Sequence, residues 1–133
     1  MTNEFLPYEQ ALELKELGFD EPCLARYSPD GIFESYRQRV FETPYTYKNC
    51  YPSQTLAPLY QQAFRFFRNK YNMLANVYSN ASGFLYEYHD TIGGTHRFDS
   101  GFEGTNAGGC WDSYEEAELA CIKKLIQVVK QSL

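Results

Sequence analysis

Apolar side chains recur with helical spacing in three stretches of the chain, residues 7–17, 57–72 and 113–130. In each stretch they gather on one side of a helical wheel, and most charged side chains fall on the other. This pattern predicts three short amphipathic helices, each with one face turned toward a core.

Two of these stretches also carry signals for where a helix begins or ends. Gly18 follows the first stretch and is typical of a residue that ends a helix in the left-handed conformation. Ser113 and Glu116 have the spacing of a capping box at the start of the third. On the wheel of that third helix, Tyr114 belongs to the apolar stripe, so we expect its ring to be buried.

The middle stretch carries five aromatic rings and three basic side chains in sixteen positions. Phe64, Phe67 and Tyr71 fall on the apolar half of its wheel, whereas Arg65 and Arg68 fall on the opposite half. A surface that stacks on nucleic-acid bases would interleave rings with charges. The separation of the two kinds therefore predicts that the rings form part of a core.

Short runs rich in β-branched and aromatic residues lie between the predicted helices. Turn-forming residues divide them into a hairpin over 23–39, an irregular strand in 40–55, a second hairpin over 73–79 and 84–90, and a last strand over 95–103. The predicted class is α+β, in the order α-β-β-(β)-α-β-β-β-α. Two hairpins plus one or two further strands would form one antiparallel sheet, packed by the three helices. The length suits a single domain over residues 1–133.

The composition of the chain indicates in which cellular compartment the protein is located. The chain lacks an apolar run of the ~20 residues that cross a bilayer, and its first residues lack the pattern of a secretion signal. We therefore expect a cytoplasmic protein that does not bind membranes. The four cysteines are irregularly spaced, which favours reduced thiols over a disulfide framework. The 22 Phe and Tyr residues could leave some rings exposed, which would favour a homodimer.

Charge is distributed unevenly. The net charge is −5, made up of −5 in residues 1–25, +3 in residues 26–97 and −3 in residues 98–133. A nucleic-acid-binding domain is usually strongly basic, so this balance makes nucleic acid an unlikely partner.

Catalytic patterns are absent from the sequence. His89 and His96, even with Asp90 and Asp99 nearby, match no established metal-ligand spacing, so we predict no metal site and no cofactor. Nor is there a nucleophile motif. The sequence therefore favours a protein that is not an enzyme, although catalytic residues that meet only in the fold stay possible.

Glu118 is a separate case, because its wheel position lies inside the apolar stripe of the third helix. Burial would raise the pKa of its carboxyl unless a cation or hydroxyl met it. A wet position at the end of the sheet is the simpler interpretation.

Two glycine-rich turns carry the main binding hypothesis. Exposed backbone amides and a positive helix N-terminus attract anions, while a tryptophan can stack on a nucleotide-like ligand. Against this, Asp112 and Glu116 place negative charge beside the second turn. The candidate ligand-binding residues are Gly94, His96, Arg97, Gly108, Gly109 and Trp111.

A nucleic-acid alternative uses the second hairpin. Tyr86 and Tyr88 share one predicted strand face and could stack on single-stranded bases. Arg65, Arg68 and Arg97 would contact phosphates.

Three segments, "PYEQALELKELGFDEPC" (7–23), "APLYQQAFRFFRNKY" (57–71) and "SYEEAELACIKKLIQVVK" (113–130), resemble a family of small uncharacterised proteins of bacteriophages and prophages of gut bacteria. The last helix is also loosely similar to the phage αβα-sandwich domains. The resemblance covers about fifty residues. It implies a phage accessory protein acting in the host cytoplasm, and it implies no particular site residue.

The leading hypothesis is a non-enzymatic binding protein that takes a host protein or a small anionic, nucleotide-like ligand, with counter-defence as one use. The alternatives are single-stranded nucleic-acid binding, a virion-associated structural protein and an unrecognised small enzyme.

Overall fold

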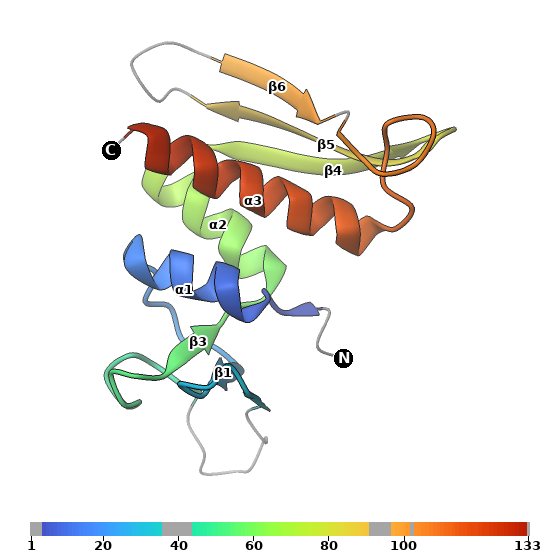
Figure 1. The fold of residues 1–133 in the computed structure, drawn as a ribbon. Helices are drawn as coiled ribbons and strands as arrows, with labels where there is room; N and C mark the ends of the chain where they lie inside the picture. Colours follow the sequence, from blue (N-terminus) through green and yellow to red (C-terminus); the bar gives the residue numbers. More distant parts are fainter. Residues whose placement is uncertain (1–3, 36–43, 91–96, 102, 133) are drawn as a thin grey trace. The chain divides into compact units, whose positions relative to one another are not determined.

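A computed structural model describes residues 4–35, 44–90, 97–101 and 103–132 (Figure 1). The predicted α+β class and element order are confirmed. The elements are α1 (Tyr8–Glu16), β1 (Ala25–Tyr27), β2 (Phe33–Ser35), β3 (Thr55–Ala57), α2 (Tyr60–Tyr71), β4 (Leu74–Asn80), β5 (Gly83–Asp90), β6 (Arg97–Gly101) and α3 (Tyr114–Ser132).

The strands form two antiparallel sheets of three strands, β2-β1-β3 and β4-β5-β6, where the sequence predicts one sheet. The chain also divides into two compact units, Met1–Ala63 and Phe64–Leu133, with the boundary inside α2. We describe each unit by itself. A single domain over residues 1–133 stays a prediction.

In the first unit, β1 is the central strand of three short ones. Its three residues pair with β2 on one side and with β3 on the other. Helix α1 packs beside β3, and its Ala11 and Leu14 are buried with Leu56 of that strand. The apolar stripe that predicts α1 is therefore the face that forms this core.

The end of α1 has the geometry expected from Gly18. Gly18 has φ +98°. Its amide donates to the carbonyl of Lys15 at 3.1 Å, and the amide of Phe19 donates to the carbonyl of Leu14 at 2.9 Å. These two bonds make up a Schellman motif, and Phe19 is buried as that motif requires.

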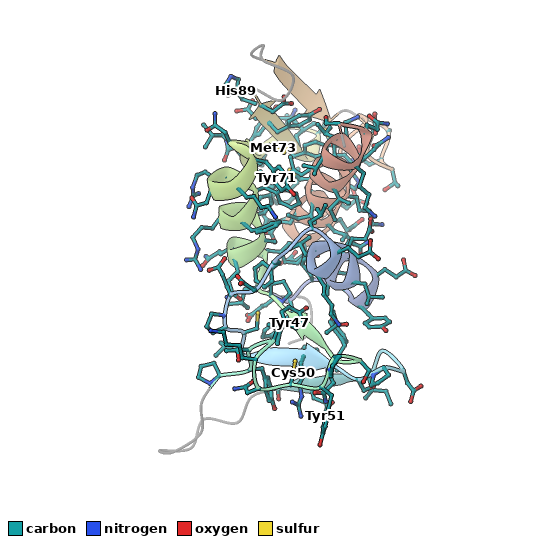
Figure 2. The ribbon with its side chains drawn as sticks, turned by 90° about the vertical axis from the view of Figure 1, so that its left-hand side faces the viewer. Tyr47, Cys50, Tyr51, Tyr71, Met73 and His89 are labelled. Atoms are coloured by element: carbon teal, nitrogen blue, oxygen red, sulfur yellow. The ribbon has the colours of Figure 1, made fainter. Side chains whose placement is uncertain are left out.

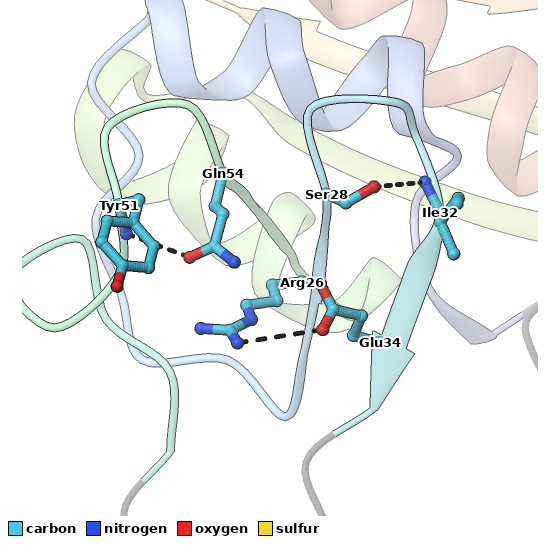
Figure 3. Close-up of polar contacts among 6 residues, drawn as sticks. All are labelled: Arg26, Ser28, Ile32, Glu34, Tyr51 and Gln54. Carbon is cyan, nitrogen blue, oxygen red and sulfur yellow. Dashed lines mark hydrogen bonds and ion pairs between the residues drawn. The ribbon is translucent and has the colours of Figure 1, made fainter.

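The first hairpin turns where it is predicted to. Gly31 has φ +80°, and its amide donates to the carbonyl of Ser28 at 2.9 Å. The amide of Ile32 donates to Oγ of Ser28 at 3.1 Å (Figure 3). An added Cβ at Gly31 would lie 3.0 Å from the ring of Tyr8, so both backbone conformation and space favour glycine here.

Side chains tie the loops of this unit to its elements. Lys15 Nζ donates to the carbonyl of Pro52 at 2.6 Å and to that of Gln54 at 2.9 Å. The hydroxyl of Tyr47 accepts from the amide of Leu56 at 3.0 Å. The hydroxyl of Tyr27 donates to the carbonyl of Leu6 at 2.6 Å.

In the second unit, β4 and β5 pair along their whole length, from Leu74 opposite His89 to Asn80 opposite Gly83. Strand β6 pairs with the other side of β5. Helix α3 packs on β4 and β5. The second predicted hairpin is confirmed, with Ala81 and Ser82 as its two turn residues.

The rings of α2 are turned inward, as their separation from the charges predicts. Phe67 is fully buried, and its ring centroid lies 5.4 Å from that of Phe66 in an edge-to-face arrangement. Tyr71 lies 5.9 Å from Phe66 and is half-buried. Arg65 and Arg68 are exposed. Core packing is therefore confirmed for these rings.

Helix α3 buries seven side chains along one stripe, including Cys121, Leu125 and Val129. The prediction for Tyr114 is wrong, because its ring is 44% exposed. Tyr114 is the first residue of α3, and its ring centroid lies 6.1 Å from that of Phe84 in an edge-to-face arrangement. In the described part of the chain, no helix has the length and apolar character needed to span a bilayer.

Candidate ligand-binding site

The segment between β6 and α3 folds back onto the β4–β5 hairpin. The amide of Phe84 donates to the carbonyl of Trp111 at 2.8 Å, and the amide of Trp111 donates to the carbonyl of Phe84 at 2.9 Å. This pair of bonds fixes Trp111 beside the start of β5.

Glycines make this close approach possible. An added Cβ at Gly104 would lie 2.1 Å from the carbonyl carbon of Cys110, and one at Gly108 would lie 2.6 Å from Cβ of Ser82. At Gly83 it would meet the Trp111 carbonyl oxygen at 2.5 Å. Gly83 and Gly104 therefore allow backbone to pack on backbone, and Gly108 allows the turn to pack against the Ser82 side chain.

The amides of this turn are already used, which overturns the prediction that Gly108 and Gly109 offer exposed amides to an anion. Asn106 Oδ1 accepts from the amides of Gly108 at 3.0 Å and Cys110 at 2.9 Å. The Asn106 carbonyl accepts from the amide of Gly109 at 3.1 Å. The asparagine side chain bonds the nearby backbone, as this residue type often does in turns.

The start of α3 is occupied in the same way. Ser113 Oγ accepts from the amide of Glu116 at 3.2 Å and donates to the Glu116 carboxylate at 2.9 Å. The capping box is thus confirmed, except that Glu116 contacts the serine hydroxyl instead of the serine amide. With Glu115 also in the first turn, this helix end is negatively charged.

The other turn of the binding hypothesis falls largely outside the described residues. Gly94 and His96 lie outside them. The backbone of Arg97 is described as the first residue of β6, opposite Asp90, but its side chain is not. The structure therefore leaves these three as predictions.

Trp111 is the candidate residue that the structure places in a hollow. Its ring is 8% exposed and lies 5.5 Å from the ring of Tyr86, with 33° between their planes. Beside them run Ala120, Lys123, Lys124 and Gln127 of α3. This hollow, which we call the Trp111 hollow, has a volume of about 210 Å³ and is open to solvent.

The four α3 residues are spaced i, i+3, i+4 and i+7, so they form one stripe along the helix. Ala120 is small and leaves room, while Lys123 and Lys124 bring two positive charges to one wall. Glu103 adds one carboxylate to the lining. The charged lining is therefore net positive, with two aromatic residues and an amide beside it, which suits binding of a small anion.

Tyr86 and Tyr88 do not present the stacking faces that the nucleic-acid alternative requires. They are only 3% and 6% exposed. Both lie on the strand face that α3 covers, since Tyr86 contacts Trp111 and lines the Trp111 hollow. Arg65 and Arg68 are exposed, but they are left without this aromatic platform.

The thiols of the chain are poor candidates for a nucleophile. Cys23, Cys110 and Cys121 are buried, and burial raises the pKa of Cys23 to about 12. Cys50 is half-buried; burial raises the pKa of its thiol, an effect that the charges of Arg26 and Lys15 partly oppose. A thiol with a raised pKa is protonated at neutral pH and is a poor nucleophile.

The loop that carries Cys50 also exposes an aromatic side chain, that of Tyr51. Tyr51 is 75% exposed and extends away from the sheet (Figure 2). Its amide donates to Oε1 of Gln54 at 3.0 Å (Figure 3). Its carbonyl accepts from the amide of Gln54 at 2.9 Å. The backbone of Tyr51 is thus fixed in a hydrogen-bonded turn, and its side chain is exposed.

Glu118 is half-buried, so its position inside the apolar stripe of the helical wheel corresponds to partial burial in the structure. Burial, and next the carboxylate of Glu115, raise its pKa to about 7. Among the residues the structure describes, no group of three or more His, Cys, Asp or Glu side chains could hold a metal ion.

Lys123, Lys124 and Gln127 were not among the candidates named from the sequence. Their helical spacing marks one stripe, but the sequence does not show that Trp111 and Tyr86 lie against it.

Comparisons of the chain with protein-family models, with curated proteins and with solved structures found no match. The resemblance to phage proteins therefore stays a prediction.

Proposed function

We propose that this protein is a non-enzymatic binding protein that takes a small anionic, nucleotide-like ligand in the Trp111 hollow. The observation that carries the proposal is the pair Lys123 and Lys124 on one wall of a hollow whose other wall holds the rings of Trp111 and Tyr86. On the resemblance to phage proteins, we place this activity in the cytoplasm of an infected host, where sequestering a nucleotide signal would blunt defence.

The size of the hollow limits the ligand. Drug-sized molecules occupy pockets of roughly 300–1,000 Å³. At about 210 Å³, the Trp111 hollow suits one phosphate group or one base with its edge on the rings, and the remainder of a larger nucleotide would lie in solvent.

The net charge of the chain also affects which ligands can bind. The whole chain carries −5, which repels anions at long range, so the two lysines must attract the ligand locally. We therefore expect binding to weaken as salt is added, because both lysines are at least partly exposed and salt screens such charges.

Isothermal titration calorimetry tests the proposal with inorganic phosphate, AMP, ADP-ribose and a cyclic dinucleotide. The variant Lys123→Gln/Lys124→Gln should weaken binding of the best ligand at least tenfold. Lys48→Gln, which removes one exposed lysine in the first unit, is the control and should leave binding unchanged. No heat with any of the four ligands at low salt would reject the proposal.

A second variant tests Arg97, because Arg97 is one of the ligand-binding residues predicted from the sequence. Arg97→Ala should weaken binding only if its side chain also reaches the ligand. Loss in Lys123→Gln/Lys124→Gln with no loss in Arg97→Ala would confine the site to the Trp111 hollow.

A host protein is the second candidate partner, and Tyr51 favours it. An exposed tyrosine supplies a large contact area with few rotatable bonds and is enriched among residues that dominate interface energies. Tyr51→Ser should abolish retention of a specific host protein by the immobilised chain, whereas Lys48→Gln should not. Equal retention by Tyr51→Ser would reject this role for Tyr51.

A further inference from the structure

Strand β4 forms an edge of the sheet β4-β5-β6, and it is long for an edge. Its seven residues pair with β5 on one side. Within the described residues of the second unit, no strand pairs with its other side. In an antiparallel ladder, alternate residues turn their N–H and C=O groups away from the paired neighbour. The outer side of β4 therefore presents a row of backbone donors and acceptors.

Nothing in the sequence of β4 guards this edge. "LANVYSN" contains no charged residue and no proline, and its ladder with β5 continues without a bulge. Natural proteins usually block an exposed edge with lysine, proline, a bulge or a very short strand.

The other edge strands are protected in these ways. β6 carries Arg97 and Asp99 within its five residues. β2 is only three residues long, and its Glu34 forms an ion pair with Arg26 at 3.8 Å. β3, on the other side of β1, is likewise only three residues long. Among the four edge strands that the described residues form, the unguarded edge is therefore specific to β4.

We propose that β4 pairs with β4 of a second copy of this chain, across a two-fold axis at Val77. An antiparallel pair is the arrangement that such an axis produces, and it would join the two sheets into one of six strands. Val77 would then face its own copy, Asn76 would face the partner's Tyr78, and Ala75 would face the partner's Ser79.

The composition of β4 favours a second copy as the occupant. No like charges would meet across the axis, because the strand has none. Asn76, Ser79 and Asn80 each carry both a donor and an acceptor, so they need no complementary sequence in the partner. Leu74 is 50% exposed and would be partly covered by the opposing strand end. A strand that carries no charge, and whose polar side chains can both donate and accept hydrogen bonds, is complementary to a second copy of itself.

This pairing is independent of the proposed ligand site. The Trp111 hollow includes Glu103, which follows β6, and β6 is the strand at the opposite edge of the sheet. A dimer through β4 would therefore leave both hollows open.

Light scattering coupled to size-exclusion chromatography tests the proposal on the full chain. At tens of micromolar we expect twice the 15.5 kDa mass of one chain. Asn76→Lys should weaken the dimer at least tenfold, because it places two lysines diagonally across the axis, within reach of each other. In the single chain the same lysine would face Glu87 of β5, a favourable pair, so the fold should persist.

Asn69→Lys, which adds the same charge at an exposed position of α2, is the matched control and should leave the dimer intact. As a second readout, hydrogen exchange of β4 amides should slow as protein concentration rises in the wild type and not in Asn76→Lys. A wild-type chain that stays at 15.5 kDa, or a dimer that Asn76→Lys leaves intact, would overturn the proposal.

Discussion

The two units of this chain are stabilised by different kinds of contact. In the first, strands are three residues long, and Lys15, Tyr27 and Gln62 each donate to a backbone carbonyl at least 21 residues away. In the second, β4 and β5 pair over seven positions under a helix of 19 residues with a continuous apolar stripe. A region with short ladders depends on individual polar side chains, whereas one with long ladders depends on the helix that covers it.

The largest effect should come from the apolar stripe of the second unit. Leu125 is fully buried on α3, so Leu125→Ala removes apolar contacts and leaves a cavity. We expect it to lower the free energy of unfolding by about 2–5 kcal/mol. Denaturant titration followed by circular dichroism measures this.

Gln127→Ala, at an exposed position of the same helix, should change the free energy of unfolding by less than about 0.5 kcal/mol. Equal losses in the two variants would contradict the view that α3 stabilises its sheet through the buried stripe.

In the first unit the comparable test removes the polar contacts of one side chain. Lys15→Met keeps the aliphatic stem and removes the two charge-assisted bonds to Pro52 and Gln54. The expected loss is about 1.5–3 kcal/mol. Lys48→Met, at an exposed position of the same unit, is the matched control, and thermal unfolding of both variants gives the comparison. A loss no larger than that of the control would show that these bonds contribute nothing net.

A smaller effect should follow from one hydroxyl. Tyr47→Phe leaves the amide of Leu56 without its acceptor, and Leu56 is fully buried. We expect a loss of about 1–2 kcal/mol in denaturant titrations. Tyr51→Phe removes the same atom from a ring that is mostly in solvent, and a similar loss there would refute this explanation.

The smallest effect should depend on pH. The pKa of Glu118 is raised from 4.5 to about 7, so the folded chain binds this proton more tightly than the unfolded chain does. The free energy of unfolding should therefore fall as pH rises from 4.5 to about 7. Glu118→Gln should restore about 1 kcal/mol at pH 8, a figure reduced because the side chain is partly exposed.

Thermal unfolding at pH 5 and pH 8 checks this prediction, with Glu9→Gln, at an exposed position of α1, as the control. A variant that stays as pH-dependent as the wild type would show that another group titrates.

Local rules predict much of this fold. The Schellman end at Gly18, the capping box at Ser113 and the turn at Gly31 each depend on a few neighbouring residues, and each is present. The number of sheets could not be predicted in this way, because it depends on which strands meet after distant segments pack. Tyr114 shows the same limit, since a helical wheel does not tell where the covering sheet ends.

The candidate site was predicted only in part. Trp111 lines the hollow, but the turn before it does not offer the amides of Gly108 and Gly109 to a ligand. Asn106 takes up those amides with its own side chain and carbonyl, and the sequence does not distinguish that arrangement from an open anion-binding turn. The lysines of the hollow are identified only once α3 is placed beside Trp111.

Trp111 is the single tryptophan of the chain, and it lies where the returning segment, the hairpin and the proposed ligand meet. The protein therefore carries one indole chromophore at the place of greatest interest. Its emission wavelength and quenching can follow ligand arrival or detachment of the segment without any added label, and no second indole contributes a background.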